Sequence, residues 1–251
     1  MRDRRPLNLL LGLLLALAII LPARATALVA DLSSYLVAVT TGFEGANLML
    51  FGAIDGPGDV VVVLRGPETV QTVFRKSQVA GIWMNTDSVT FHGVPAFYQV
   101  ASNRPLDEVA GPDVRQRLEL GVDNIRMSLP SARASGPAAD AWRDGLVRAK
   151  VRRGLFARTP SVVRVMGGQL FRTEFYLPDN VPTGLYRADV YLLRDGALVA
   201  AQTTPLSISK VGFEADLSDY AHHHGAIYGA GAIALALFAG WLAYLVFARR
   251  R

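Results

Sequence analysis

The longest apolar stretch of the chain lies at its C-terminal end. Residues 225–248 contain no charged side chain, and the chain ends directly after them with Arg249, Arg250 and Arg251. A helix over 225–248 would be about 36 Å long, enough to cross a hydrocarbon core of about 30 Å with some tilt. Cationic flanks stay on the cytoplasmic side. The pattern therefore predicts a single transmembrane helix at 225–248, a cytoplasmic basic tail at 249–251, and all preceding residues outside the cytoplasm.

A second apolar stretch lies at the N-terminal end. The run Leu7–Leu21 follows three arginines within the first five residues and precedes the small-residue pattern Ala23-Arg24-Ala25. This layout predicts a secretory signal peptide over residues 1–25 that is cleaved after export. An uncleaved first membrane span is the alternative. Both interpretations place the middle of the chain in the same exported compartment.

The middle of the chain is dominated by the short apolar and alternating runs of β-strands. Val60–Leu64, bounded by a Gly- and Pro-containing turn, predicts a strand buried on both faces. The pair Asp195-Gly196 predicts a two-residue type I′ turn between Leu185–Leu193, whose residues alternate in polarity, and Ala197–Thr203. Further strands are predicted at Tyr35–Thr40, Leu48–Phe51, Val70–Arg75, Ile82–Met84 with Val89–Phe91, Ala96–Ala101, Val162–Val165, Leu170–Tyr176 and Leu206–Lys210.

Helical spacing interrupts the β-pattern. It covers Leu106–Leu118 and Ala138–Arg153, with a linker at Pro130–Pro137 between them and Gly154 as the stop signal. In the second segment an ion pair of Asp144 with Arg148 is predicted from the i,i+4 spacing. The apolar face of this segment is predicted to contain Ala139, Trp142, Leu146 and Ala149.

These elements predict a mainly β protein. Residues 28–210 are interpreted as an immunoglobulin-like β-sandwich with a helical insertion at about 106–157, followed by a juxtamembrane segment at 211–224 and the C-terminal transmembrane helix. Two smaller β-domains remain the alternative.

The net charge of +5 does not indicate a nucleic-acid-binding protein. Seven of the 26 Lys and Arg residues lie in the two terminal segments, against one of the 21 acidic residues, so residues 26–248 carry 19 basic and 20 acidic side chains. The positive charge therefore belongs to membrane targeting. The chain has no cysteine, so the exported part must be stabilised by its own core. Together with the signal peptide, this favours the bacterial periplasm and the inner membrane.

Motifs of known catalytic or cofactor sites do not occur in the sequence. There is no G-x-S-x-G, H-E-x-x-H or P-loop pattern and no cysteine nucleophile. His92 has no companion motif, and His222-His223-His224 adjoins the apolar span, where a polar collar is a simpler interpretation than a metal site. The protein is accordingly predicted to be no enzyme and to need no cofactor or metal.

Two clusters remain as candidate binding residues. The first is basic and predicts either a small-anion site or a solvated helix face; its central members are Arg148, Lys150, Arg152 and Arg153, with Arg143, Arg158 and Arg164 nearby. The second is a stripe of small residues in the apolar span, which predicts close packing against the helix of another membrane protein; it contains Gly225, Gly229, Ala232, Ala236 and Gly240. Lipid is the other expected contact of this span.

Several stretches of the chain resemble the alphaproteobacterial transmembrane family Alph_Pro_TM. They are Phe51–Gly56, Gly81–Asn85, Val94–Tyr98, Leu170–Arg172, Pro182–Tyr186, and Tyr228-Gly229 leading into Gly240–Ala243. The resemblance implies a membrane location and an exported domain, and it implies an association with exporters of the TauE/SafE type. It implies no activity. Gly81–Asn85 is either an interaction surface or a buried strand and turn, and the buried interpretation is favoured.

The sequence therefore predicts a membrane-anchored, non-enzymatic periplasmic protein that supports another inner-membrane protein, such as a transporter. A small-anion-binding module that feeds a TauE/SafE-like exporter is the alternative. An enzyme of an unrecognised class is a more distant third.

Overall fold

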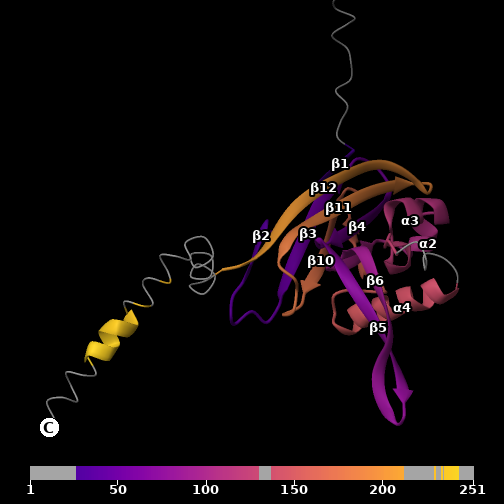
Figure 1. The fold of residues 1–251 in the computed structure, drawn as a ribbon. Coiled ribbons are helices and arrows are strands. Elements are labelled where there is room, and N and C mark those ends of the chain that lie inside the picture. Colours follow the sequence, from indigo (N-terminus) through magenta and orange to yellow (C-terminus); the bar gives the residue numbers. More distant parts are fainter. Residues whose placement is uncertain (1–26, 130–136, 212–228, 230–232, 234, 243–251) are drawn as a thin grey trace, which may run out of the picture.

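The computed structural model describes residues 27–129, 137–211, 229, 233 and 235–242, with the backbone alone at 137 and 138. The predicted signal peptide, the basic tail, His222–His224, Gly225 and Ala232 lie outside these residues, as do most of the predicted linker and the juxtamembrane segment. The described part is mainly β, as the sequence predicts (Figure 1).

Two sheets form the body of the protein. The first has four strands in the order β1 (Leu28–Leu32), β3 (Ala46–Ile54), β10 (Leu170–Leu177) and β9 (Arg164–Met166). The second has six strands in the order β2 (Leu36–Val39), β12 (Ala197–Lys210), β11 (Gly184–Arg194), β4 (Asp59–Arg65), β7 (Tyr98–Ser102) and β8 (Ser161–Val162). Each sheet combines strands from both halves of the chain, so the alternative of two smaller β-domains is wrong.

Most neighbouring strands in these sheets are antiparallel. The exceptions are β2 with β12 and β7 with β8. The predicted hairpin between β11 and β12 is confirmed, since Arg194 pairs with Ala197 and both turn residues have positive φ, 50° at Asp195 and 76° at Gly196. The two segments predicted at Ala197–Thr203 and Leu206–Lys210 form the single strand β12, because Pro205 sits within the strand without ending it.

One apolar core joins the two sheets and the helices. Val60–Leu64 of β4 is fully buried along its whole length, which confirms the prediction of a strand covered on both faces. On β11, Tyr186, Ala188 and Val190 are buried and Arg187 is exposed, as the alternation predicts, but Asp189, expected on the same wetter face as Arg187, is buried as well. The Tyr186 hydroxyl donates a hydrogen bond to the Pro182 carbonyl, four residues upstream, at 2.6 Å.

The helices lie between β7 and β8 in the sequence and gather on one side of the body (Figure 1). They are α2 (Leu106–Val109), α3 (Pro112–Leu118), the short 3₁₀ helix η1 (Val122–Asn124) and α4 (Pro137–Arg152). The prediction of one continuous helical segment at Leu106–Leu118 is wrong, because Ala110 is extended and Pro112 starts a new helix. Gly154 follows α4 with a φ of 71°, as expected of a stop residue.

A long hairpin is inserted between β4 and β7. Its strands are β5 (Glu68–Val79) and β6 (Ile82–Pro95), which pair with each other and with no other strand of the described residues. The segments predicted at Ile82–Met84 and Val89–Phe91 are two parts of β6. Figure 1 shows the far end of the hairpin reaching well beyond the sandwich and the helices.

Candidate functional site: a projecting hairpin and a basic cleft

The β5–β6 hairpin is buried at its base and exposed at its end. At the base, Val89, Phe91 and Val94 of β6 belong to the core. At the other end the strands are joined by Ala80-Gly81, with φ values of 51° and 83°, as in a two-residue hairpin turn of the primed type. The chain therefore holds one end of the hairpin firmly and presents the other to the surroundings.

The exposed end of the hairpin is apolar. We call Val79, Ile82, Trp83 and Met84 the hairpin tip; all four are exposed, Ile82 by 67 % and Trp83 by 68 %. The favoured interpretation of Gly81–Asn85 as a buried strand and turn is therefore wrong. The strand pattern itself was correct, but no second layer of the described structure covers this part of the hairpin.

Apolar side chains occupy both faces of the hairpin tip. Val79 pairs with Ile82, and the next pair, Gln78 with Trp83, points to the opposite face because successive residues alternate. Met84 shares the face of Ile82. A flat surface could cover only one of these faces, so full burial of the tip requires surroundings that enclose it.

The base of the hairpin borders a cleft beside α4. The cleft has a volume of about 480 Å³ and lies between the middle of β5 and the C-terminal half of α4. The Arg75 guanidinium of β5 lies over the Trp142 ring of α4 at 4.6 Å, a cation–π contact that links the two walls. The cleft is lined by Gln71, Thr72, Val73, Phe74, Gly145, Leu146, Arg148, Ala149, Lys150, Arg152 and Arg153.

The structure brings the central predicted basic residues to this one cleft. Arg148, Arg152 and Arg153 are exposed, and Lys150 is buried with 5 % of its surface accessible. No aspartate or glutamate is among the lining residues. The predicted ion pair of Asp144 with Arg148 is absent from the described ion pairs, and one guanidinium nitrogen of Arg148 lies 3.9 Å from the place of a Cβ at Gly145.

Lys150 is the least solvated of these cations. Its Nζ donates a hydrogen bond to the Ala96 carbonyl at 3.3 Å and lies 5.7 Å from the centre of the Phe156 ring. Burial, and after it the charge of Arg153, lowers the pKa of the ammonium group from its ordinary value of 10.5. The side chain is therefore held in a place that penalises its charge.

Arg143, Arg158 and Arg164, the outer members of the predicted basic cluster, lie away from the cleft. Arg143 donates hydrogen bonds to the backbone carbonyls of Asp123 and Ile125, and Arg158 lies 3.7 Å from the Asp123 carboxylate. Arg164 is an exposed residue of β9 in the other sheet. These three arginines are not among the residues that line the cleft.

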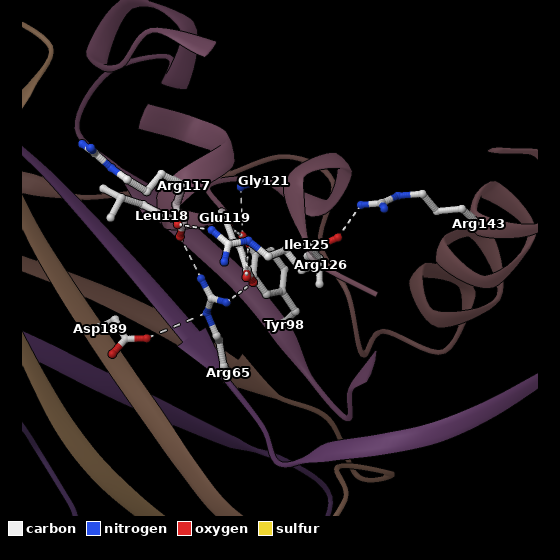
Figure 2. A network of polar contacts seen from close by, with 10 residues as sticks. All are labelled: Arg65, Tyr98, Arg117, Leu118, Glu119, Gly121, Ile125, Arg126, Arg143 and Asp189. Carbon is white, nitrogen blue, oxygen red and sulfur yellow. Dashed lines mark hydrogen bonds and ion pairs between the residues drawn. The ribbon is translucent and has the colours of Figure 1, made fainter. Parts of the chain in front are cut away.

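A partly buried polar junction fastens the helices to the second sheet (Figure 2). Arg65 at the end of β4 forms an ion pair with Glu119, donates a hydrogen bond to the Leu118 carbonyl at 2.8 Å, and lies 3.8 Å from Asp189 of β11. Arg126 also reaches Glu119, at 3.5 Å. We call these residues, with Tyr98, the Arg65 junction.

Tyr98 completes the Arg65 junction from β7. Its hydroxyl donates a hydrogen bond to the Glu119 carbonyl at 2.5 Å and accepts one from the Gly121 amide at 2.9 Å. Burial raises the pKa of this hydroxyl above its ordinary value of 10.0, and the Arg65 guanidinium opposes part of that rise. The junction fixes the segment that leads into η1, and Arg143 of α4 is hydrogen-bonded to the backbone of that segment.

Comparison with protein families gives one match. The family model described as "Putative transmembrane protein (Alph_Pro_TM)" covers residues 27–249. The chain belongs to this family. No curated protein and no solved structure matches it.

Most stretches that resemble Alph_Pro_TM have a clear role in the fold. Val94 and Ala96–Tyr98 are buried, and Gly52 leaves no room for a Cβ between the Val29 carbonyl and the Phe171 ring. Pro182 accepts the hydrogen bond from Tyr186. Gly81–Asn85 differs from these stretches, since its side chains pack against no core.

The predicted anchor of this Alph_Pro_TM protein is described at ten positions. Residues 229, 233 and 235–242 are helical, and the described part of the chain contains no helix that is both long and apolar enough to span a bilayer. Of the small-residue stripe, Gly229, Ala236 and Gly240 are described. A Cβ at Gly229 or Gly240 would meet no atom within 4 Å.

The remaining candidate for chemistry is His92. It is exposed on β6, and its backbone pairs with Ser128 through two hydrogen bonds of 2.9 Å. Within the described ranges, no group of three His, Asp or Glu side chains is placed to hold a metal ion. The Arg65 junction was not predicted, and the exposure of the hairpin tip corresponds to the less favoured of the two interpretations of Gly81–Asn85.

Proposed function

We propose that this Alph_Pro_TM protein is a non-enzymatic accessory protein of the inner membrane that binds another membrane protein, a transporter, through its hairpin tip. The apolar tip at the end of the β5–β6 hairpin is the observation that supports this most directly. Large exposed apolar side chains that are grouped on a projecting element are typical of interaction sites. Trp is also among the residues that contribute most to interface energies.

The shape of the hairpin tip supports a protein groove as the partner site. Val79 and Ile82 face one way and Trp83 the other, so a groove that receives the end of the hairpin would bury both faces. Burial of a large apolar side chain contributes roughly 1.5–3 kcal/mol, and the tip offers four such side chains. Part of this gain is offset by the cost of association.

The proposed topology places the sandwich in the periplasm. The sequence patterns that predict a signal peptide at 1–25 and a transmembrane helix at 225–248 followed by Arg249–Arg251 support this arrangement, as does membership in a transmembrane family. A reporter enzyme that requires the periplasm, fused after residue 251, should be inactive, whereas one fused after Lys210 should be active. The reverse pattern would contradict the topology.

We infer further that the sandwich is immunoglobulin-like. The order β1-β3-β10-β9 corresponds to strands A-B-E-D of that fold, and β12-β11-β4-β7 corresponds to G-F-C-C′. The parallel pairing of β2 with β12 corresponds to the first strand crossing to the second sheet. Tyr186, near the start of the strand that corresponds to F, makes the backbone hydrogen bond of a tyrosine corner.

The contact is tested by site-specific photo-cross-linking in native membranes. A photoreactive residue at position 83 should give a discrete adduct with one membrane protein, and Ile82→Ser should reduce its yield. The same residue at position 185 is the matched control, because Leu185 is 65 % exposed but lies on the sandwich. Adducts with lipid only, or equal yields from both positions, would contradict the proposal.

The predicted helix contact supplies a second test. If the small-residue stripe packs against the same partner, Gly229→Leu with Gly240→Leu should release the partner in mild detergent, because large side chains prevent close helix approach. Ile233→Leu with Leu237→Ile, two conservative changes elsewhere on this helix, is the control. Co-purification that survives the double glycine change would restrict the contact to the hairpin tip.

A further inference from the structure

The cleft between α4 and β5 concentrates positive charge without a counter-ion. Arg148, Lys150, Arg152 and Arg153 all line it, no carboxylate does, and none of the four forms an ion pair with a described residue. Like charges placed this close repel one another unless an anion is present. The cleft is therefore an electrostatic site that the rest of the described protein leaves uncompensated.

The dipole of α4 accounts for only part of this charge. Basic residues are favourable at a helix C-terminus because the last carbonyls carry the equivalent of about half a negative charge. Four cations exceed that by a wide margin. Arg148 also lies a full turn before the end of the helix at Arg152, where the effect of the dipole has largely faded.

Lys150 gives the strongest indication of a ligand. A lysine ammonium can donate three hydrogen bonds, and buried charged groups are normally paired. Only 5 % of the surface of Lys150 is accessible to solvent. Among the described residues its Nζ nevertheless donates a single hydrogen bond, to the Ala96 carbonyl. An anion in the cleft would supply the missing partner and offset the cost of burying the charge.

The cleft also has room for a ligand. Gly145, in the middle of α4, places no side chain between Val73 and Arg148, and the volume of about 480 Å³ is ample for a tetrahedral oxyanion. Arg148 and Arg152 are one helical turn apart, on the same side of α4. Guanidinium groups bind the oxygens of such anions through paired, charge-assisted hydrogen bonds.

We propose that the α4–β5 cleft binds a phosphate-type oxyanion through Arg148, Arg152, Arg153 and Lys150. The anion is either free in solution or part of an anionic phospholipid headgroup, since both present the same charged oxygens. This site is separate from the hairpin tip and does not depend on the function proposed for it.

The test uses the full chain in nanodiscs of zwitterionic phosphatidylcholine. Titration with inorganic phosphate, at constant ionic strength set with chloride, should raise the melting temperature, because a ligand of the folded state stabilises it. A second preparation in nanodiscs containing phosphatidylglycerol tests the lipid headgroup. Stabilisation by phosphate identifies a free anion, and stabilisation by phosphatidylglycerol alone identifies the headgroup.

Two sets of variants separate binding at the cleft from general charge effects. Arg148→Gln with Arg152→Gln should weaken the response about tenfold or more, because two charge-assisted hydrogen bonds are lost. Arg172→Gln with Arg187→Gln, which changes two exposed arginines of the strands away from the cleft, should leave it unchanged. Lys150→Met retains the buried chain volume and should also abolish the response, even if the double variant fails to fold.

Three results would overturn the proposal. The first is a wild-type response to phosphate and to phosphatidylglycerol no greater than that to chloride. The second is an equal loss of response in the cleft variants and in the strand controls. The third is a full response in Lys150→Met.

Discussion

The Arg65 junction and the α4–β5 cleft both contain basic side chains, but only the junction pairs them with acidic ones. In the junction, the buried guanidinium of Arg65 meets Glu119, Asp189 and a backbone carbonyl. In the cleft, four cations are among the lining residues and no carboxylate is. In the first arrangement the charge of Arg65 is compensated by carboxylates of the chain, although its buried Nε donates no hydrogen bond, whereas in the second no described carboxylate compensates the four cations.

The difference separates a structural role from a binding role. Compensated charges in the junction hold η1 and α3 against β4 and β7, and removing one member leaves the others with fewer partners in a partly buried place. Cations without a counter-ion at a cleft do not stabilise the fold, and their mutual repulsion lowers the free energy of unfolding. The four predictions below test this contrast, beginning with the largest expected effect.

Loss of the central cation should damage the junction most. Arg65→Met is expected to lower the free energy of unfolding by about 3 kcal/mol, because Glu119 keeps only Arg126 and Asp189 keeps only the Thr203 hydroxyl as partners in a largely buried place. Arg152→Met, at the cleft, should change it by no more than about 0.5 kcal/mol. Urea unfolding in detergent micelles measures both. Similar losses in the two variants would remove the distinction between junction and cleft.

Removal of the Tyr98 hydroxyl should show how much its two hydrogen bonds contribute to the stability of the junction. Tyr98→Phe leaves the Gly121 amide and the Glu119 carbonyl without a partner, and we expect a loss of about 2 kcal/mol. Tyr186→Phe removes one hydrogen bond instead of two and should cost about 1 kcal/mol. The same unfolding measurement compares them. A larger loss at Tyr186 would mean that the Tyr98 contacts contribute little.

The two regions should respond to alkaline pH with opposite signs. The lowered pKa of Lys150 means that the unfolded chain binds more protons than the folded one between that pKa and 10.5, so this residue makes stability rise with pH in that range. The raised pKa of Tyr98 means that the folded state keeps its proton longer, so stability falls as pH rises above 10.0.

Two variants test which residue causes each of these changes of stability with pH. Lys150→Met should abolish the rise below pH 10.5, and Tyr98→Phe should reduce the fall above pH 10.0, in unfolding experiments at several pH values. An unchanged slope in Lys150→Met would show that its ammonium group is not held in the unfavourable environment that the cleft requires.

The smallest effect should come from a substitution of Gly145, the glycine in the middle of α4. Gly145→Ala is expected to stabilise the protein by about 0.5–1 kcal/mol, because glycine in a helix interior is entropically costly and the nearest atom to the new Cβ, Val73 Cγ1, is 3.8 Å away. Gly52→Ala is the opposite case, since its Cβ would collide with backbone and with Phe171. Thermal unfolding ranks the two. Destabilisation by Gly145→Ala would show that the cleft cannot accept an added methyl group.

Local patterns predicted the parts of the fold that neighbouring residues determine. The β11–β12 turn needed only Asp195-Gly196, and the burial of β4 followed from Val60–Leu64. The break before Pro112 could also have been read from the sequence. The pairing of Arg65 with Glu119 could not, because it joins residues 54 positions apart and depends on how the sheet meets the helices.

The sequence predicted the basic residues of the cleft but not its opposite wall, and it did not predict that the hairpin tip is uncovered. The basic cluster is contiguous along α4, so its members could be named, but its opposite wall on β5 could not. Lys150 was not expected on the core side of α4, although it follows Leu146 by one turn, because a lysine there contradicts the apolar pattern. The alternation of β6 does not reveal that Ile82 and Trp83 lack a covering layer, which is a property of the whole fold.

The parallel pairing of β2 with β12 has a mechanical consequence. The last strand before the predicted anchor is held by β11 along most of its length and by β2 at its C-terminal end, Ser207–Lys210, where the Ser207 amide also donates a 2.8 Å hydrogen bond to the Tyr35 carbonyl. A pull on the chain at Val211 runs along β12 and loads these hydrogen bonds together, in shear. They must then break as a group instead of opening one after another, so this end of the sandwich is well suited to resist a pull along β12.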